Sequence, residues 1–474
     1  MSLTRQIAHN TIIQMIGKVI TTGMALIAFG MMTRYLGTEQ FGWYVTAISF
    51  LQFAGILIDF GLIPVSAQML SEGHFEKTKL FHNLMGFRFV TAFVCLCIVP
   101  LLSLFFPYPH EVKIAIAFTS ISFFAISINQ ILTGFFQTEL KMHLAALGEF
   151  VGRIVLLGGL ILLIHFGAGF LPIMIVITAS SMVYTLVLLF CARKYITLGM
   201  SFDPQIWKAI AIKMWPITLS IVFNVMYLKG DTLLLSLYRP QDEVGIYGAA
   251  YRVIDILTQI AMLTMGILLP LLSSSWAKQN KEEFKGHYER SVFLMLLLGL
   301  PLATGTLVLA NPIMQLIAGS NFISAGRPLQ ILSLAVFGLF LGAIYGHTAV
   351  ALNKQKQTVI IYVSAAIITL IGYLVFIPKY GMIGAAWMSV FSELFVGILL
   401  FAVIHRFVKV PLATGPLSKI FASTFCMGIA IYLLQSLPVL LTISIGILVY
   451  GGMLLLTQAI SKATLKEIIS FKNI

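Results

Sequence analysis

Nine ionisable side chains fall within long apolar stretches of this 474-residue sequence. A charged side chain inside a membrane-spanning helix is costly unless it has a partner, a water-filled cavity or a route to the interface. Lysine and arginine in such places can bind an anionic headgroup, and a lone carboxylate can bind a proton or a sodium ion. The nine residues are Lys18, Asp59, Glu149, Arg153, Lys229, Asp231, Arg252, Asp255 and Glu393.

The stretch MYLKGDTLLLSLY (226–238) holds two of these charges. Lys229 and Asp231 are two residues apart, so they point to different faces of a helix and cannot neutralise each other well. Asp231 lies about five residues from the end of its apolar run, which is roughly 8 Å deep. Arg252 lies at a comparable depth on the next run. We therefore predict an Asp231–Arg252 contact that faces a cavity, with Lys229 long enough to reach into that cavity.

Two other pairs are spaced for contact along one helix face. Glu149 and Arg153 are four residues apart, and Arg252 and Asp255 are three apart. Each pair has two interpretations. The pair forms a local salt bridge that neutralises both charges for insertion, or its arginine faces a cavity and binds a ligand.

The remaining charges differ in their surroundings. Lys18 shares a polar strip with Thr21, which favours a cavity-lining face. Arg34 ends its apolar run and is either an interface anchor or a ligand. Asp59 precedes a tight exit and is expected to cap or pair there, with ion coupling as the second interpretation. Glu393 has no evident partner on its helix, so it is a candidate for coupling to a proton or sodium ion.

The elements that carry these residues are transmembrane helices. Hydrophobic residues make up 59% of the chain and charged residues 10%, with a mean hydropathy of +0.98. A soluble domain has about 25% charged residues. About 20 apolar residues cross a bilayer as a helix. Fourteen such spans are predicted, near 12–33, 41–64, 81–106, 113–137, 149–166, 171–192, 210–236, 245–271, 290–310, 329–352, 358–378, 382–405, 418–436 and 439–460.

Basic residues give the orientation. Of the 30 lysines and arginines, 21 lie at the N-terminus or in connections after even-numbered spans, Arg88 among them, and 5 lie in connections after odd-numbered spans. Basic residues are enriched on the cytoplasmic side. Both termini and the hydrophilic loop 273–290 are therefore predicted to be cytoplasmic. The net charge of +13 follows this asymmetry, so we expect no nucleic-acid partner.

An internal repeat relates the two halves. The motif Phe41-Gly42-x-Tyr44 opens span 2, and Val244-Gly245-x-Tyr247 opens span 8. A second match links FGAGFLP (166–172), before span 6, with YGMIGAA (380–386), before span 12. The unit is six helices, which predicts two lobes with a cavity between them. The expected fold is an all-α integral membrane protein with domains at 1–200, 201–410 and 411–474, the last holding two extra helices and a tail.

These motifs resemble a known family. TRYLGTEQFGWYVTAISFLQFAGILIDFGL (33–62) is similar to the opening of the polysaccharide (O-antigen-type) flippases of the multidrug/oligosaccharidyl-lipid/polysaccharide exporter superfamily, which are related to lipid II flippases. The family pattern is matched by Arg34, Leu36, Gly37, Glu39, Phe41, Gly42, Tyr44, Asp59, Gly61 and Leu62. Further similarity lies at 230–253 and 379–395.

The resemblance implies a flippase that moves a polyprenyl-pyrophosphate-linked oligosaccharide between leaflets of the cell membrane by alternating access. Its implied partners are membrane lipid, the lipid-linked glycan, and a glycan polymerase or other assembly proteins. Lipid II is a second candidate cargo. Two rival functions are a cation-coupled drug or metabolite antiporter and a membrane enzyme of glycan assembly. The sequence has no P-loop, HExxH or paired-cysteine zinc pattern, so we expect no cofactor and no metal.

Overall fold

The computed structural model of the chain describes residues 3–59, 65–66, 68–70, 75–409 and 414–459. Within these ranges the side chains of residues 3–15 and 56–59, and of some residues between 216 and 224, lie outside the description. The chain divides into two compact units, Met1–Gly248 and Ala249–Ile474, with the boundary inside one helix, α8. The lobe boundary near residue 200 that the repeat indicates stays a prediction.

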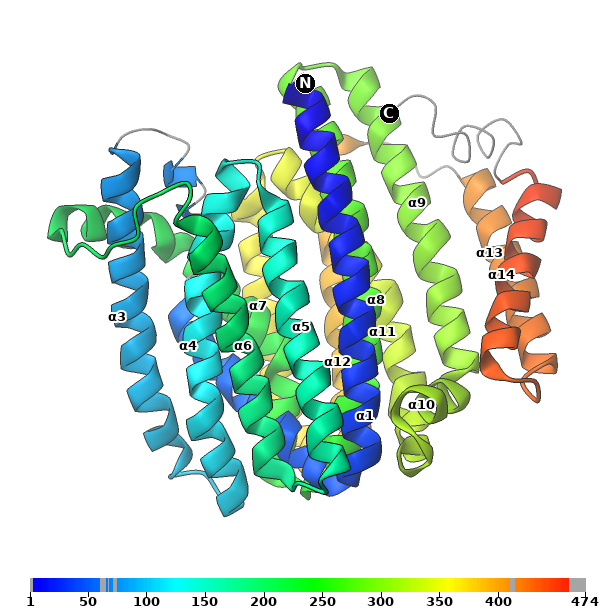
Figure 1. Ribbon diagram of the computed structural model, residues 1–474. Helices are drawn as coiled ribbons and strands as arrows, with labels where there is room; N and C mark the ends of the chain where they lie inside the picture. The colour runs from blue at the N-terminus through cyan, green and yellow to red at the C-terminus, as the bar shows by residue number, and fades with distance from the viewer. Residues whose placement is uncertain (1–2, 60–64, 67, 71–74, 410–413, 460–474) are drawn as a thin grey trace. The chain divides into compact units, whose positions relative to one another are not determined.

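The first unit is built from helices only, in the part of it that the structure describes (Figure 1). Helix α3 packs on α4, α4 on α6, α6 on α5, and α5 on α1. A continuous apolar core joins α3, α4, α6 and the start of α7, with Phe81, Phe135 and Ile210 fully buried. The helices are α1 (Leu3–Asp59), α3 (Lys77–Ser103), α4 (His110–Thr138), α5 (Met142–His165), α6 (Phe170–Ala192), α7 (Pro204–Tyr238) and the start of α8 (Gln241–Ala277).

The second unit is also helical in its described residues. Its main packing joins α11 to α12 and α9 to both α11 and α13, while α13 pairs with α14. After α8, its helices are α9 (Lys281–Val308), α10 (Ala310–Ala318), the 3₁₀ helix η1 (Ser320–Ala325), α11 (Gly326–Ala351), α12 (Gln355–Val408), α13 (Thr414–Leu433) and α14 (Val439–Leu456).

Two helices are too long to be single spans. Helix α1 has 57 residues and α12 has 54. At 1.5 Å per residue each would be about 80 Å long, against a bilayer core of roughly 30 Å. Each is interrupted by a glycine with positive φ, Gly37 (φ 70°) in α1 and Gly381 (φ 56°) in α12. Both glycines lie in turns that the sequence predicts between spans, so α1 and α12 each hold two.

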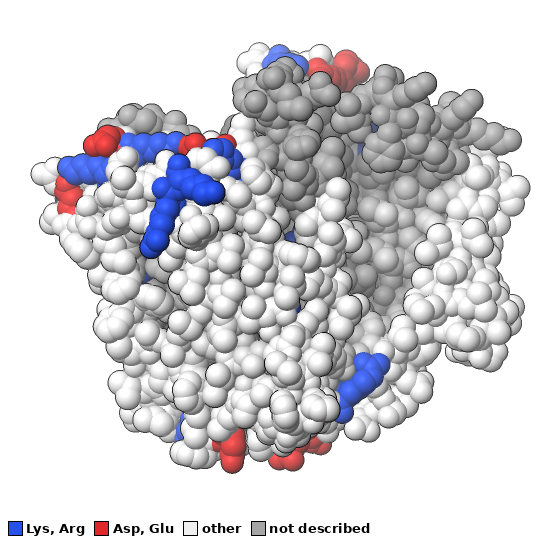
Figure 2. All heavy atoms as spheres, in the orientation of Figure 1, with Lys and Arg blue, Asp and Glu red and all other residues white. Residues whose placement is uncertain are grey.

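Eleven described helices are long and apolar enough to cross a membrane. With α1 and α12 divided at their glycines, and with α7 over the predicted span 210–236, the helices account for the fourteen predicted spans. The protein is therefore a multi-pass, all-α membrane protein, as predicted. On the face of the first unit shown in Figure 2, a broad uncharged band separates charged groups at the two ends, as a bilayer requires.

Two predicted loops are largely helical. In 273–290, α8 continues to Ala277 and α9 begins at Lys281. The Asn280 side chain accepts a hydrogen bond from the Glu283 backbone at 3.1 Å and donates one to its carboxylate at 3.0 Å, which caps α9. The connection between predicted spans 290–310 and 329–352, which the basic-residue count predicts to be outer, contains α10 and η1. Met314 on the apolar face of α10 is buried.

Arg88 was predicted to lie in a cytoplasmic connection, and the structure shows that this is wrong. It lies 11 residues inside α3, which begins at Lys77, and its side chain is 1% exposed. Its Nε donates a hydrogen bond to the Ser127 carbonyl of α4 at 3.1 Å. A buried guanidinium needs such acceptors, so Arg88 ties α3 to α4 within the span.

The turns before α5 and α12, which the predicted six-helix repeat makes equivalent, have similar geometry. Leu140 (φ 54°) and Asn353 (φ 57°) are left-handed at the same point of the two turns. The next residues, Lys141 and Lys354, each donate a backbone hydrogen bond of 2.8 Å to the carbonyl five residues earlier. The two turns thus repeat one helix-ending geometry.

Side chains repeat at these turns as well. The Lys141 ammonium lies 3.3 Å from the Tyr195 ring centroid, after α6, and the Lys354 ammonium lies 4.8 Å from the Phe407 ring centroid, at the end of α12. In each case a lysine that precedes the fifth helix of a repeat contacts an aromatic ring at the end of the sixth. The same turn geometry also occurs at Gly167, Gln279 and Gln458, so the duplication of six helices stays a prediction.

Candidate functional site

Three of the predicted charges meet in the first unit. The Lys18 ammonium, on the first half of α1, lies 3.4 Å from Glu149 Oε1 on α5. One turn further along α5, the Arg153 guanidinium lies 3.7 Å from the same oxygen. The spacing of Glu149 and Arg153 predicted their contact, whereas the position of Lys18 could not be derived from it. We call these three residues the Lys18 cluster.

The Lys18 cluster carries two positive charges and one negative charge. Its side chains are partly exposed, at 42% for Lys18, 24% for Glu149 and 33% for Arg153. Glu149 neutralises one cation, so a net positive charge stays within membrane-spanning helices. Such a charge needs water or an anionic ligand beside it. The cluster can therefore bind an anion such as a phosphate.

Asp231 lies at a second polar site, near the C-terminal end of α7. Its side chain is 0% exposed. The Tyr247 hydroxyl donates a hydrogen bond to Asp231 Oδ2 at 2.6 Å, and the Thr232 hydroxyl donates one to Oδ1 at 3.1 Å. The carboxyl is therefore well supplied with donors. The predicted Asp231–Arg252 contact joins residues of the two compact units and stays a prediction.

The two copies of the glycine motif contact each other. A Cβ at Gly42 of α1 would overlap the Gln241 carbonyl oxygen, and a Cβ at Gly245 of α8 would overlap the Thr38 carbonyl oxygen and lie 2.9 Å from the Gly42 nitrogen. Gln241 precedes Gly245 by four residues, as Thr38 precedes Gly42. The contact is thus reciprocal, as it is where a two-fold relates two surfaces.

One position shows why the two copies differ. Val45 and Gly248 occupy equivalent places in the two motifs and face each other. A Cβ at Gly248 would lie 2.6 Å from a Val45 methyl carbon. Two bulky residues cannot occupy such facing positions, so one copy has valine and the other glycine. The Thr46 hydroxyl adds a hydrogen bond of 2.5 Å to the Gln241 amide oxygen.

In the second unit Arg252 and Asp255 of α8 approach to 4.0 Å, at side-chain exposures of 37% and 33%. Glu393, on the second half of α12, is 6% exposed. The backbone of α11 approaches α12 closely there, since a Cβ at Gly338 would lie 2.6 Å from the Glu393 carbonyl carbon. Its role in ion coupling stays a prediction.

The other predicted site residues are less informative. Arg34 is exposed, and its guanidinium donates a hydrogen bond to the Gly30 carbonyl at 2.9 Å, one turn earlier. Lys229 is half-buried on α7. Asp59 ends α1, and its side chain lies outside the described residues. Within the described part of the chain, no group of three or more His, Cys, Asp or Glu could hold a metal ion.

Sequence reasoning missed the role of Tyr247. It identified the residue as part of a repeat but assigned no function to its hydroxyl. The available signal was position, because Tyr247 lies 16 residues after Asp231 across one short turn. It also missed that Lys18 and Glu149, which are 131 residues apart, share a contact.

The fold is one that membrane transporters share. The structure of the lipid II flippase MurJ in an inward closed conformation matches 93% of this chain and 98% of its own at a TM-score of 0.78 and 18% identity. An inward-facing multidrug resistance MATE transporter matches 84% of this chain and 98% of its own at a TM-score of 0.66 and 13% identity.

The sequence comparisons define the family. The family model described as "Polysaccharide biosynthesis protein" matches residues 7–276, more than half of the chain, and the chain belongs to that family. The MatE family model matches residues 216–375. The "Putative O-antigen transporter" of Shigella flexneri is 24% identical over 80% of this chain and 93% of its own length. The "Probable low-salt glycan biosynthesis flippase Agl15" of Haloferax volcanii is 22% identical over 98% of each chain. The resemblance to polysaccharide flippases of the exporter superfamily is confirmed.

Proposed function

We propose that this protein is a flippase that moves a polyprenyl-pyrophosphate-linked oligosaccharide from the inner to the outer leaflet of the cell membrane. The Lys18 cluster carries the proposal, because it holds two cations and one carboxylate, partly exposed, on membrane-spanning helices. A pyrophosphate is the anionic part of such a cargo. Family membership and the names of the two relatives point to the same class of cargo.

The proposed mechanism is alternating access between two six-helix lobes. The cations attract the pyrophosphate from the inner leaflet, while the polyprenyl tail stays in the lipid. The reciprocal contact of Gly42 and Gly245 closes α1 against α8 at the predicted outer end. Release of the headgroup to the outside requires these helices to separate. Separation would break the hydrogen bond from Thr46 to Gln241 and the close approach of the two backbones.

The proposed location is the inner, cytoplasmic membrane, with both termini on the cytoplasmic side. The 21 to 5 distribution of basic residues supports this orientation. A glycan polymerase or other assembly proteins would take up the product outside. No energy source is assigned, although Glu393, buried in α12, is the candidate for proton or sodium coupling.

A cellular experiment tests the function. Loss of the gene should cause the lipid-linked glycan to accumulate on the inner leaflet, and the wild-type chain should restore its export. Lys18→Ala with Arg153→Ala should fail to restore export at equal protein level. Lys113→Ala, which removes a cation at the far end of α4, should restore it. Accumulation of lipid II in place of the glycan would make lipid II the cargo.

A further inference from the structure

A second feature of the first unit is an apolar groove on its surface. It lies between α3, α4 and α6 and has a volume of about 410 Å³. Met85 and Phe89 of α3, Phe124 of α4, and Leu186 and Leu189 of α6 line it. Almost all of its surface is hydrocarbon or sulfur, and none of the Lys18 cluster borders it.

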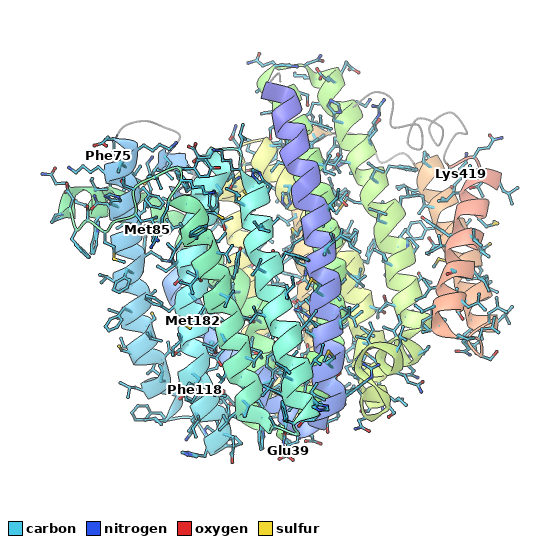
Figure 3. The ribbon with its side chains drawn as sticks, viewed as in Figure 1. Glu39, Phe75, Met85, Phe118, Met182 and Lys419 are labelled. Carbon is cyan, nitrogen blue, oxygen red and sulfur yellow. The ribbon has the colours of Figure 1, made fainter. Side chains whose placement is uncertain are left out.

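One end of the groove lies toward the end of α6. Met182, which also lines it, is ten residues before the end of α6 at Ala192, or about 15 Å from that end. Met85 of α3 and Met182 of α6 lie on the same side of the unit (Figure 3). The hydrocarbon core is roughly 30 Å thick. Ile121 of α4 also lines the groove, 17 residues or about 25 Å before the end of α4 at Thr138. The groove therefore runs from the ends of α3 and α6 where Lys77 and Arg193 lie to beyond the middle of these helices.

Arg193 lies on the same face of α6 as two residues that line the groove. Leu186, Leu189 and Arg193 follow one another at helical spacings of three and four residues, so they share a face of α6. The Arg193 backbone still donates a hydrogen bond to the Leu189 carbonyl at 3.1 Å, which keeps it in helical register. Arg193 and Lys194 are both exposed. Lysine and arginine side chains gather over these helix ends in Figure 2.

The chain that leads from α6 to α7 covers the same end of the groove. Leu198, Gly199 and Met200 line it. This segment is fixed to α3 by a hydrogen bond of 3.0 Å from the Ser201 backbone to the His82 carbonyl, and by another of 2.8 Å from the Asp203 backbone to the Asn83 amide oxygen. Gly199 lies against the His82 ring, where a Cβ would be 3.0 Å from Cε1.

We propose that this groove binds one anionic phospholipid of the adjacent leaflet, with an acyl chain among α3, α4 and α6 and its phosphate at Arg193. The groove and Arg193 together match the two parts of such a lipid. The apolar groove suits an acyl chain, and the exposed Arg193 guanidinium beyond its end suits the phosphate. Arginine binds phosphate through paired hydrogen bonds. The lipid would hold the segment 198–200, which connects the six-helix repeats.

The test counts lipids retained by the purified full-length chain. The chain is equilibrated with vesicles of equal phosphatidylglycerol and phosphatidylcholine, extracted in mild detergent, and analysed by native mass spectrometry. We expect one retained phosphatidylglycerol in wild type. Arg193→Ala should weaken its retention about tenfold, the size of one charge-assisted hydrogen-bonding group. Leu186→Trp, which fills the groove from an exposed position, should weaken it as well.

Two variants serve as matched controls. Arg406→Ala removes an exposed arginine near the end of α12, and Leu162→Trp adds the same bulk at an exposed leucine of α5. Both should retain phosphatidylglycerol as wild type does. Equal retention of the two lipids, or full retention by Arg193→Ala, would mean an adventitious lipid only and overturn the proposal. Displacement of phosphatidylglycerol by polyprenyl phosphate would overturn it too, by assigning the groove to the tail of the proposed cargo.

Discussion

Gly42 and Gly245 lie so close that neither position has room for a Cβ, and each faces the backbone carbonyl four residues before the other. The two residues come from the two copies of one sequence motif. A duplicated element that contacts its own copy forms a self-complementary joint. This joint fixes how α1 and the start of α8 pack.

Substitution at this joint should destabilise the protein. Gly245→Ala places a methyl group against the Thr38 carbonyl, and we expect a loss of about 1–3 kcal/mol from overpacking. Gly266→Ala, on the same helix with nothing within 4 Å of its Cβ, should be neutral or slightly stabilising. Thermal unfolding in detergent measures both. Similar unfolding temperatures for the two variants would contradict the close contact.

The Tyr247 hydroxyl should matter more than that of its repeat equivalent. Tyr247→Phe removes a 2.6 Å hydrogen bond from a carboxyl that is 0% exposed. Hydrogen bonds to charged groups contribute about 1.5–3 kcal/mol. Tyr44→Phe changes the same residue type in the first motif and is the control. A smaller effect of Tyr247→Phe than of Tyr44→Phe would show that the Asp231 bond contributes nothing.

Lys18 and Glu149 should be energetically coupled. Glu149→Gln leaves two cations of the cluster without their carboxylate, whereas Lys18→Met removes one cation. The double variant should be more stable than the sum of the single effects predicts, with a coupling of about 0.5–3 kcal/mol. A thermodynamic cycle on purified protein measures the coupling. Additive effects would mean that the 3.4 Å contact is not formed in the membrane protein.

Asp203, in the connection before α7, should make the stability of the protein depend on pH. A hydrogen bond from Lys79 to Asp203 holds the pKa of the Asp203 carboxyl below its ordinary value, with help from the Gln205 backbone that it caps. A lowered folded-state pKa stabilises the fold above the ordinary value. That stabilisation is lost as the pH falls below about 4 and toward the folded pKa.

Unfolding temperature measured between about pH 6 and pH 3 tests this effect. The loss on acidification should be smaller in Asp203→Asn than in wild type, and salt should reduce the difference because both side chains are partly exposed. Lys208→Met, which removes a nearby lysine of α7, should keep the wild-type dependence. Identical acid profiles for wild type and Asp203→Asn would show that this group does not contribute.

The fold class could be predicted from the sequence. In lipid the backbone groups of each span must be hydrogen-bonded within its own helix, so each span appears as a long apolar run. The sequence also located the turns at Gly37 and Gly381, where glycine permits positive φ. It could not derive which charges meet. The pair Glu149 and Arg153 follows from helix periodicity, but the approach of Lys18 depends on how α1 packs on α5. Arg88 was counted with the connections although it falls within the predicted span 81–106, and its hydrogen bond to the Ser127 carbonyl of α4 could not be derived from the sequence.

Transport by the reconstituted protein tests the central claim most directly. The chain is placed in vesicles with a fluorescent polyprenyl-pyrophosphate oligosaccharide, and the fraction of glycan exposed to an added glycosidase is followed with time. The account predicts rapid exchange between leaflets with wild type, and exchange close to protein-free vesicles with Lys18→Ala and Arg153→Ala together. Exchange at the wild-type rate in that double variant would contradict it.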